Sequence, residues 1–185
     1  MKRYRQIEAI LCVERPRRII EIGTWNGDRA IAMCKAAKTN HYYGFDLFEE
    51  ASDQSDRVEF NVKRHFRVDL VEEKLLEAGL MPFLIKGNTR ETLPEYIEKN
   101  GEIADFAFID GGHSVETIWS DLEWVKKALK PGSLILMDDF YLNMKDEFLD
   151  KFGANRVLES MEYQLLPQAD PVTGGGEVVI AYLRA

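Results

Sequence analysis

Residues 18–27 read RIIEIGTWNG, and this stretch decides how the rest of the chain is interpreted. Ile19, Ile20 and Ile22 form a nearly continuous apolar run that stops at Gly23, which is typical of a central strand in a parallel sheet covered on both faces. The residues after Gly27, DRAIAMCKAAK, have the spacing of a helix. Ligands of such open sheets bind beyond the carboxyl ends of the strands, so the loop 23–27 is predicted to line a binding site.

Working outward, the chain repeats this pattern of strand and helix. Further strands are predicted at 41–46, 82–86, 104–110 and 133–137, with a helix at 4–14, a mobile loop at 48–56 and a helix at 58–79. A polar helical stretch is expected around 145–151. The last two strands, 163–166 and 177–183, are joined without room for a helix, so they form an antiparallel hairpin. We therefore expect a single α/β domain over residues 1–185, with 1–17 as a short helical segment at its start.

The composition narrows the class of protein. The net charge is -8, which gives no support to a nucleic-acid partner, and no apolar run approaches the length of a membrane span. Cys12 and Cys34 belong to no metal-binding or redox motif, as expected of a cytoplasmic protein. A homodimer is compatible with the sequence but nothing in it requires one.

Polar residues follow the predicted strand ends and suggest a nucleoside site. The spacing Gly23-x-x-x-Gly27 lacks the three glycines of the dinucleotide fingerprint, which argues against a pyrophosphate-bearing cofactor. Asp46 closes the second strand about twenty residues after the loop, where a carboxylate can accept both hydrogens of a ribose diol. The alternative for Asp46 is a cap or turn acid. Together with the glycine loop, it favours a nucleoside.

Three carboxylates, Asp110, Asp138 and Asp139, follow the fourth and fifth strands. Crowded acids repel one another unless a cation lies among them, and oxygen ligands suit Mg²⁺ or another divalent ion. The alternative is that Asp139 caps the next helix. His113 is close in sequence to Asp110 and could accept a proton at neutral pH, although a lone loop histidine is more often an ordinary surface residue.

The segments EIGTWNG, GFD, KGNTRETLP, FIDGGHS, LKPG and LILMDDF resemble the successive motifs of class I S-adenosylmethionine-dependent methyltransferases. The resemblance covers nearly the whole chain from about residue 18. Within that superfamily, IDGGHS and MDDF are similar to the small metal-dependent O-methyltransferases of the antibiotic-sugar and catechol types. The resemblance implies a Rossmann-like three-layer sandwich with a seven-stranded, mostly parallel sheet of order 3-2-1-4-5-7-6 and an antiparallel last strand.

The resemblance also implies the roles of individual residues. Residues expected to bind S-adenosylmethionine are Glu21, Gly23, Thr24, Gly27, Asp46, Asn88, Thr89 and Asp110. Those expected to bind the metal, Mg²⁺ or another divalent cation, are Asp110, Asp138 and Asp139. His113 and Asp110 are the expected catalytic residues, with His113 at the position where catechol-type enzymes have a lysine. A second departure is the short segment before the first strand, which leaves open what covers the substrate.

The predicted activity is metal-assisted O-methylation of a small hydroxylated molecule. In this hypothesis the ion lowers the pKa of the acceptor hydroxyl and His113 takes its proton. Two alternatives stay open: a metal-independent methyltransferase acting on another acceptor, such as a nitrogen or a carboxylate, and a non-catalytic module that binds S-adenosylmethionine. A nucleotide-dependent oxidoreductase is disfavoured by the missing glycines.

Overall fold

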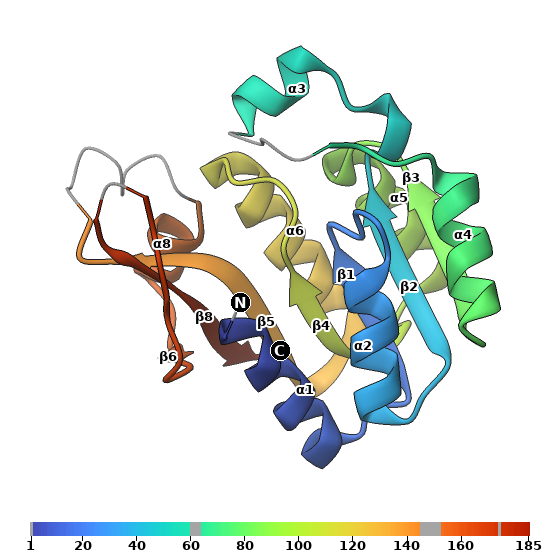
Figure 1. Ribbon diagram of the computed structural model, residues 1–185, viewed down its shortest axis with the longest axis horizontal. Helices are drawn as coiled ribbons and strands as arrows, with labels where there is room; N and C mark the ends of the chain where they lie inside the picture. Colours follow the sequence, from blue (N-terminus) through green and yellow to red (C-terminus); the bar gives the residue numbers. More distant parts are fainter. Residues whose placement is uncertain (1, 60–63, 145–152, 174) are drawn as a thin grey trace.

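A computed structural model describes residues 2–59, 64–144, 153–173 and 175–185. Helices and strands alternate through most of the chain, as the sequence predicts (Figure 1). The helices are α1 (Arg3–Glu14), α2 (Asp28–Ala37), η1 (Phe48–Glu50), α3 (Asp53–Val58), α4 (Val68–Glu77), α5 (Thr89–Asn100), α6 (Val115–Ala128) and α8 (Gly153–Leu158). The strands are β1 (Arg18–Ile22), β2 (His41–Asp46), β3 (Met81–Lys86), β4 (Ala104–Ile109), β5 (Leu129–Leu142), β6 (Gln164–Leu165), β7 (Asp170–Pro171) and β8 (Glu177–Arg184).

The sheet confirms the predicted fold class. Its strand order is β3-β2-β1-β4-β5-β8-β6, and the pairs from β3 to β5 are all parallel. The strand β8 is antiparallel to both β5 and β6, which confirms the terminal hairpin. The short strand β7 also pairs with β8 and makes the sheet eight-stranded, one more than predicted. The chain order reverses between β1 and β4, which is where open sheets of this kind bind their ligands.

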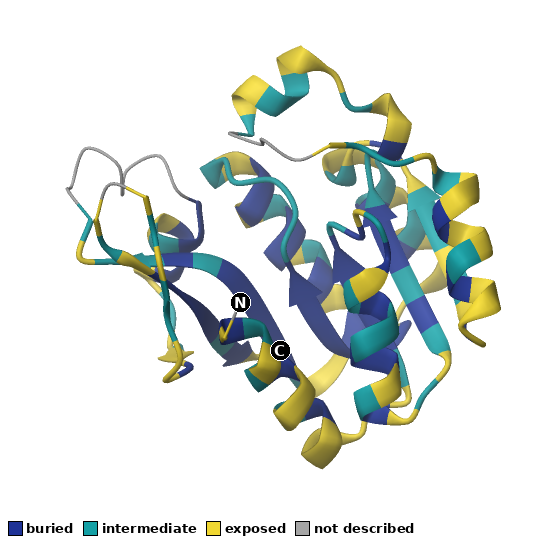
Figure 2. Cartoon of the chain, in the orientation of Figure 1, coloured by how far each residue is buried: buried dark blue, intermediate teal, exposed yellow. Residues whose placement is uncertain are grey.

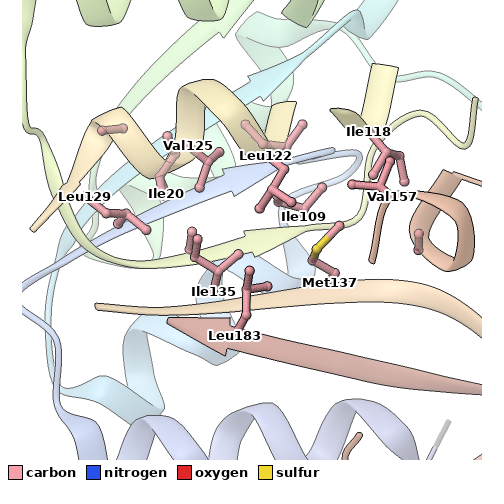
Figure 3. Close-up of a cluster of buried hydrophobic side chains, with 14 of the residues drawn as sticks. Ile20, Ile109, Ile118, Leu122, Val125, Leu129, Ile135, Met137, Val157 and Leu183 are labelled. Carbon is pink, nitrogen blue, oxygen red and sulfur yellow. The ribbon is translucent and has the colours of Figure 1, made fainter. Parts of the chain in front are cut away.

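Two hydrophobic clusters cover the two faces of the sheet and make three layers. Helices α1, α2 and α4 contribute to the cluster on one face, and α5, α6 and α8 to the cluster on the other. The second cluster includes α6 residues such as Leu122 and Val125, which lie over Ile20 and Ile109 of the central strands (Figure 3). The sheet is accordingly buried at its centre while the outer helical surfaces are exposed (Figure 2). None of the described helices combines the length and apolarity that a bilayer span requires.

The segment between β2 and β3 differs from the sequence prediction. Residues 48–58 contain η1 and α3 rather than an irregular loop, because Ser52 and Ser55 form a capping box that starts α3. The helix predicted over 58–79 is shorter and runs only from Val68 to Glu77, ending before Gly79 with its φ of 81°. The helical stretch predicted around 145–151 lies outside the described residues, and α8 follows it.

The fifth strand continues past the residue at which it was predicted to end. It runs to Leu142, and its pairing with β8 shifts between Met137 and Phe140. Asp138 and Asp139 therefore lie in a β-bulge, and Asp139 has a φ of 56°. The alternative that Asp139 caps a following helix is wrong, because the strand continues through it. Bulges redirect side chains, and this one turns two consecutive acids toward the rim of the sheet.

Candidate active site

A cavity of about 400 Å³ lies at the carboxyl ends of β1, β2 and β4. Five of the predicted site residues on three strand ends and one helix start line it: Gly23, Asp46, Asn88, Thr89 and Asp110. His113 borders the same cavity. The prediction that the strand ends meet at one rim is therefore confirmed for these residues. The predicted site residues that do not line the cavity are Glu21, Thr24, Gly27, Asp138 and Asp139.

The two glycines of the first loop are required for different reasons. Gly23 has a φ of 90°, and a Cβ atom there would lie 2.1 Å from the carbonyl oxygen of Asp110. This close approach brings the ends of β1 and β4 together at the cavity. Gly27 has a φ of 77° and starts α2, but a Cβ there would meet Leu75 of α4 at 3.0 Å. Gly27 thus serves helix packing, while Gly23 shapes the cavity.

Glu21 and Thr24 lie beneath the loop rather than in the cavity. Both are buried, and Tyr42 joins them: its hydroxyl hydrogen bonds to Thr24 at 3.0 Å and donates to Glu21. Burial raises the pKa of Glu21 to about 8, although Arg29 and the Tyr42 hydrogen bond act in the opposite direction. Glu21 is therefore protonated at neutral pH, and its placement favours support of the loop over direct contact with a ligand.

Asp46 and Asn88 hold the loops around the cavity as well as lining it. The Asp46 carboxylate accepts hydrogen bonds from the backbone N–H groups of Trp25 and Phe48, each at 2.8 Å. The side-chain oxygen of Asn88 accepts from the N–H of Arg90 and caps α5. Asp46 is therefore a turn acid and Asn88 a helix cap. Each carboxylate oxygen has two lone pairs, so these bonds leave Asp46 able to accept from a ribose diol as well.

A cover over the cavity comes from the segment around α3, which lies across the ends of the strands (Figure 1). Glu59 attaches this segment to the start of α6. Its carboxylate accepts from the Ser114 N–H at 2.9 Å, the Ser114 hydroxyl at 3.0 Å and the Thr117 hydroxyl at 2.7 Å. Sequence reasoning missed Glu59, because a cap supplied from a distant segment leaves no local pattern.

His113 is held at both ring nitrogens. Its Nδ1 lies 2.7 Å from the backbone oxygen of Glu59, and its Nε2 lies 2.7 Å from Asp139 Oδ2. Burial lowers the pKa of His113, but the hydrogen bond and charge of Asp139, with the charge of Asp110, outweigh it and raise the pKa above its usual value. One ring nitrogen thus faces a backbone oxygen and the other a carboxylate, and this fixes the orientation of the imidazole.

The three aspartates converge as predicted. Each of Asp110, Asp138 and Asp139 offers one carboxylate oxygen within 4.8 Å of the others. The N-terminal helix, however, places Arg3 directly on this cluster. Arg3 Nε donates to Asp138 Oδ1 at 2.8 Å, and Nη2 donates to Asp138 Oδ2 at 2.9 Å. The Tyr4 hydroxyl also donates to Asp138 Oδ2, at 2.5 Å.

These contacts decide whether the cluster can hold a divalent ion. The oxygens have the right chemistry and spacing, but both oxygens of Asp138 already bind the Arg3 guanidinium. An ion among them would face a buried positive charge at close range. The predicted metal ligands do come together, and yet the cluster as it stands does not fit a divalent ion.

The fold and the site together define a class of protein: a Rossmann-like α/β domain with a nucleoside-sized cavity at the switch point of its sheet. Residues 20–140 match the family model of the methyltransferase domain, which covers well over half of the chain. The chain therefore belongs to the methyltransferase domain family, and the resemblance read from its motifs is confirmed.

Solved structures share the fold. The O-methyltransferase TomG from Streptomyces achromogenes, in complex with SAM, has a TM-score of 0.68 at 16% identity, over 100% of this chain and 80% of that chain. An O-methyltransferase from Bacillus cereus, in complex with SAH, has 0.69 at 17% identity, over 100% and 81%. An rRNA methylase from Streptococcus thermophilus has 0.66 at 13% identity, over 100% and 97%. No curated protein matches the chain.

Proposed function

We propose that this chain is an S-adenosylmethionine-dependent O-methyltransferase that acts on a small hydroxylated molecule. The observation that carries the proposal is the cavity. Its glycine loop, the acid at the end of β2 and the start of α5 lie at one rim, and Asp110 and His113 border the same space. A nucleoside-bearing methyl donor and a hydroxyl acceptor can therefore meet there. The structures of TomG with SAM and of the B. cereus enzyme with SAH, which share the fold, support the choice of donor.

The described residues fit this cofactor. Gly23 lets the ends of β1 and β4 approach closely beside the cavity, Asp46 would supply a carboxylate for the ribose hydroxyls, and Asn88 with Thr89 would contact the adenine. Glu21 and Thr24 support the loop from beneath. S-adenosylmethionine supplies an electrophilic methyl group on a sulfonium when it is bound. The protein's contribution is to hold donor and acceptor in line, which by itself accounts for much of such a rate enhancement.

The acceptor hydroxyl is proposed to lie beside Asp110 and His113 and to lose its proton to the pair formed by His113 and Asp139. For this step His113 is neutral, its Nδ1–H stays on the backbone oxygen of Glu59, and the acceptor hydroxyl takes the place of Asp139 beside Nε2. The deprotonated oxygen would then be the nucleophile for the methyl group of a bound donor. His113 is thus the catalytic base and Asp139 its partner, and neither step needs a divalent ion.

The acceptor is proposed to be small because the chain offers little to a polyanion. The net charge of -8 would repel an RNA backbone, even though an rRNA methylase shares the fold. The segment around α3 also covers the cavity, which leaves limited space for a large acceptor.

The proposal is tested by cofactor binding and by methyl transfer. Calorimetry should show binding of S-adenosylhomocysteine and none of NAD. Transfer from methyl-labelled S-adenosylmethionine is then measured to catechols, vicinal diols and sugars, with RNA as a comparison and with and without EDTA. Turnover of a hydroxylated small molecule in EDTA is the expected result. Binding without turnover of any acceptor would favour the non-catalytic module instead.

A matched pair of histidine variants tests the catalytic role. His113→Gln should reduce kcat by about two orders of magnitude, as general-base removal usually does, with little change in cofactor affinity. His41→Gln, at the start of β2 and so at the opposite end of the sheet, is the control and should retain full activity. Equal activity of the two variants would refute the role of His113.

A further inference from the structure

The side chain of Arg3 reaches from the N-terminal helix to the aspartate cluster. It is only 9% exposed and makes a two-pronged ion pair with Asp138. One of its terminal nitrogens also lies 3.7 Å from Asp139 Oδ1, and another lies 3.3 Å from Asp170 Oδ2. Paired bonds of this kind are the strongest that a carboxylate makes with a side chain, and burial strengthens them further.

Tyr4, the next residue, extends the arrangement. Its hydroxyl accepts from Arg3 Nη2 at 2.9 Å and donates to Asp138. The guanidinium of Arg29 lies 3.3 Å from the centre of the Tyr4 ring, and its Nε lies 3.7 Å from Asp110 Oδ2. The first turn of α1, together with Arg29, therefore links Asp110, which follows β4, to the two acids in the bulge of β5.

Each acid of the cluster faces a basic side chain among the described residues. Asp138 faces Arg3, Asp139 faces His113 and Asp110 faces Arg29. Repulsion among crowded acids was the reason to expect a metal ion, and the two guanidinium groups of Arg3 and Arg29 weaken that reason. A divalent ion would have to displace Arg3 from both oxygens of Asp138.

We propose that Arg3 is the resident cation of the aspartate cluster and occupies the place for which the motif pattern predicts a divalent metal ion. The helix α1 delivers it, so the short N-terminal segment completes the rim instead of covering the substrate. Arg3 is thus a positioning residue that fixes Asp138 and, through Asp139, the orientation of His113. Only the effect of Arg3 on the orientation of His113 rests on the proposed function. Whether Arg3 excludes a divalent ion can be tested by ion binding, without turnover.

The test is calorimetric titration of Mn²⁺ into the full chain and its variants. Wild type should show no Asp138-dependent binding at millimolar Mn²⁺, whereas Arg3→Gln, which uncovers the carboxylates, should bind at least tenfold more tightly. The double variant Arg3→Gln with Asp138→Asn should lose the new site. Arg3→Lys keeps a cation at this place and should bind Mn²⁺ no more tightly than wild type. Arg5→Gln is the matched control, since Arg5 is exposed on the same helix.

Two results would overturn the inference. One is wild-type protein that binds Mn²⁺ as tightly as Arg3→Gln and loses it on Asp138→Asn. The other is a folded Arg3→Gln, shown by circular dichroism, that gains no ion site. If Arg3→Gln does not fold, the comparison of wild type with Asp138→Asn and Arg3→Lys still decides whether the native cluster binds the ion. Binding of S-adenosylhomocysteine, measured separately, shows whether a failure concerns Arg3 or the proposed function.

Discussion

Gly23 is the residue on which the cavity depends most directly. It combines a φ of 90° with a Cβ position 2.1 Å from the Asp110 carbonyl oxygen. Gly23→Ala should therefore push β1 and β4 apart and weaken S-adenosylhomocysteine binding by more than tenfold. Gly79→Ala is the matched control: Gly79 has a φ of 81° and nothing within 4 Å of its Cβ position.

The control separates backbone strain from the clash. Gly79→Ala should cost about 1 kcal/mol of stability through the positive φ alone and leave cofactor affinity unchanged. Thermal unfolding and calorimetry on both variants give the two quantities. Comparable cofactor affinity in the two variants would show that the approach of Gly23 to Asp110 does not shape the binding site.

Asp121 of α6 is a buried acid that no sequence pattern singled out. Its side chain is fully buried, and neither carboxylate oxygen has a hydrogen bond of good geometry among the described residues, although the Thr89 hydroxyl interacts with it. Burial, with a contribution from the charge of Glu59, raises its pKa to about 7. Asp121 is thus mostly protonated below neutral pH in the folded protein.

This raised pKa predicts how stability depends on pH. The unfolded chain releases the Asp121 proton from about pH 4, whereas the folded chain keeps it until about pH 7. Its contribution to stability is therefore lost as pH rises through this window. Asp121→Asn should be more stable than wild type at pH 8, by up to a few kcal/mol, with a smaller difference at pH 4. Urea unfolding at both values checks this, with the exposed Glu123→Gln as control. A constant difference across pH would contradict it.

At the scale of elements, the sequence predicted the strands and the major helices well. The apolar runs of β1 and β4 and the stripe of α6 carry strong periodic signals, because each element buries its own face. The segment 48–59 has no such signal. It is polar and short of apolar residues, and its order comes from the Ser52 capping box and from Glu59, which reaches α6. Contacts between distant segments of this kind cannot be read from local patterns.

Glu59 should therefore control how firmly the α3 segment closes over the cavity. Glu59→Ala removes three hydrogen bonds to Ser114 and Thr117 and leaves α6 without this cap, so we expect S-adenosylhomocysteine to dissociate several times faster. Asp53→Asn, at an exposed position of α3, is the matched control. Stopped-flow dissociation and limited proteolysis measure the effect. Identical dissociation rates in the two variants would mean that the Glu59 contacts do not hold the cover.

At the scale of the whole molecule, the start of α1 and the short strand β7 meet at the site. The backbone N–H of Lys2 donates to Asp170 Oδ1, and Arg3 joins Asp170 to Asp138. The sequence indicated the acids and the glycine loop, because they follow strands. It did not indicate Arg3, which is one of several basic residues in the N-terminal segment. Only the docking of α1 on the sheet brings Arg3 and Tyr4 to the cluster.

That docking depends on apolar contacts at the far end of α1. Leu11 is 0% exposed and belongs to the cluster on one face of the sheet, whereas Val13, two residues later, is 81% exposed. Leu11→Ala should lower the free energy of unfolding by about 2 to 5 kcal/mol, because it removes buried methyl groups and leaves a cavity. Val13→Ala should change it by less than about 0.5 kcal/mol.

The two variants also test whether α1 is integral to the domain. Because α1 packs on the same cluster as β1 and β4, the unfolding of Leu11→Ala in urea should remain one transition when followed by far-UV circular dichroism and by tryptophan fluorescence. If α1 were instead a loosely attached segment, Leu11→Ala would match Val13→Ala in stability. Arg3 would then be held at the aspartates only by its own ion pair, and truncating Leu11 would not weaken that contact.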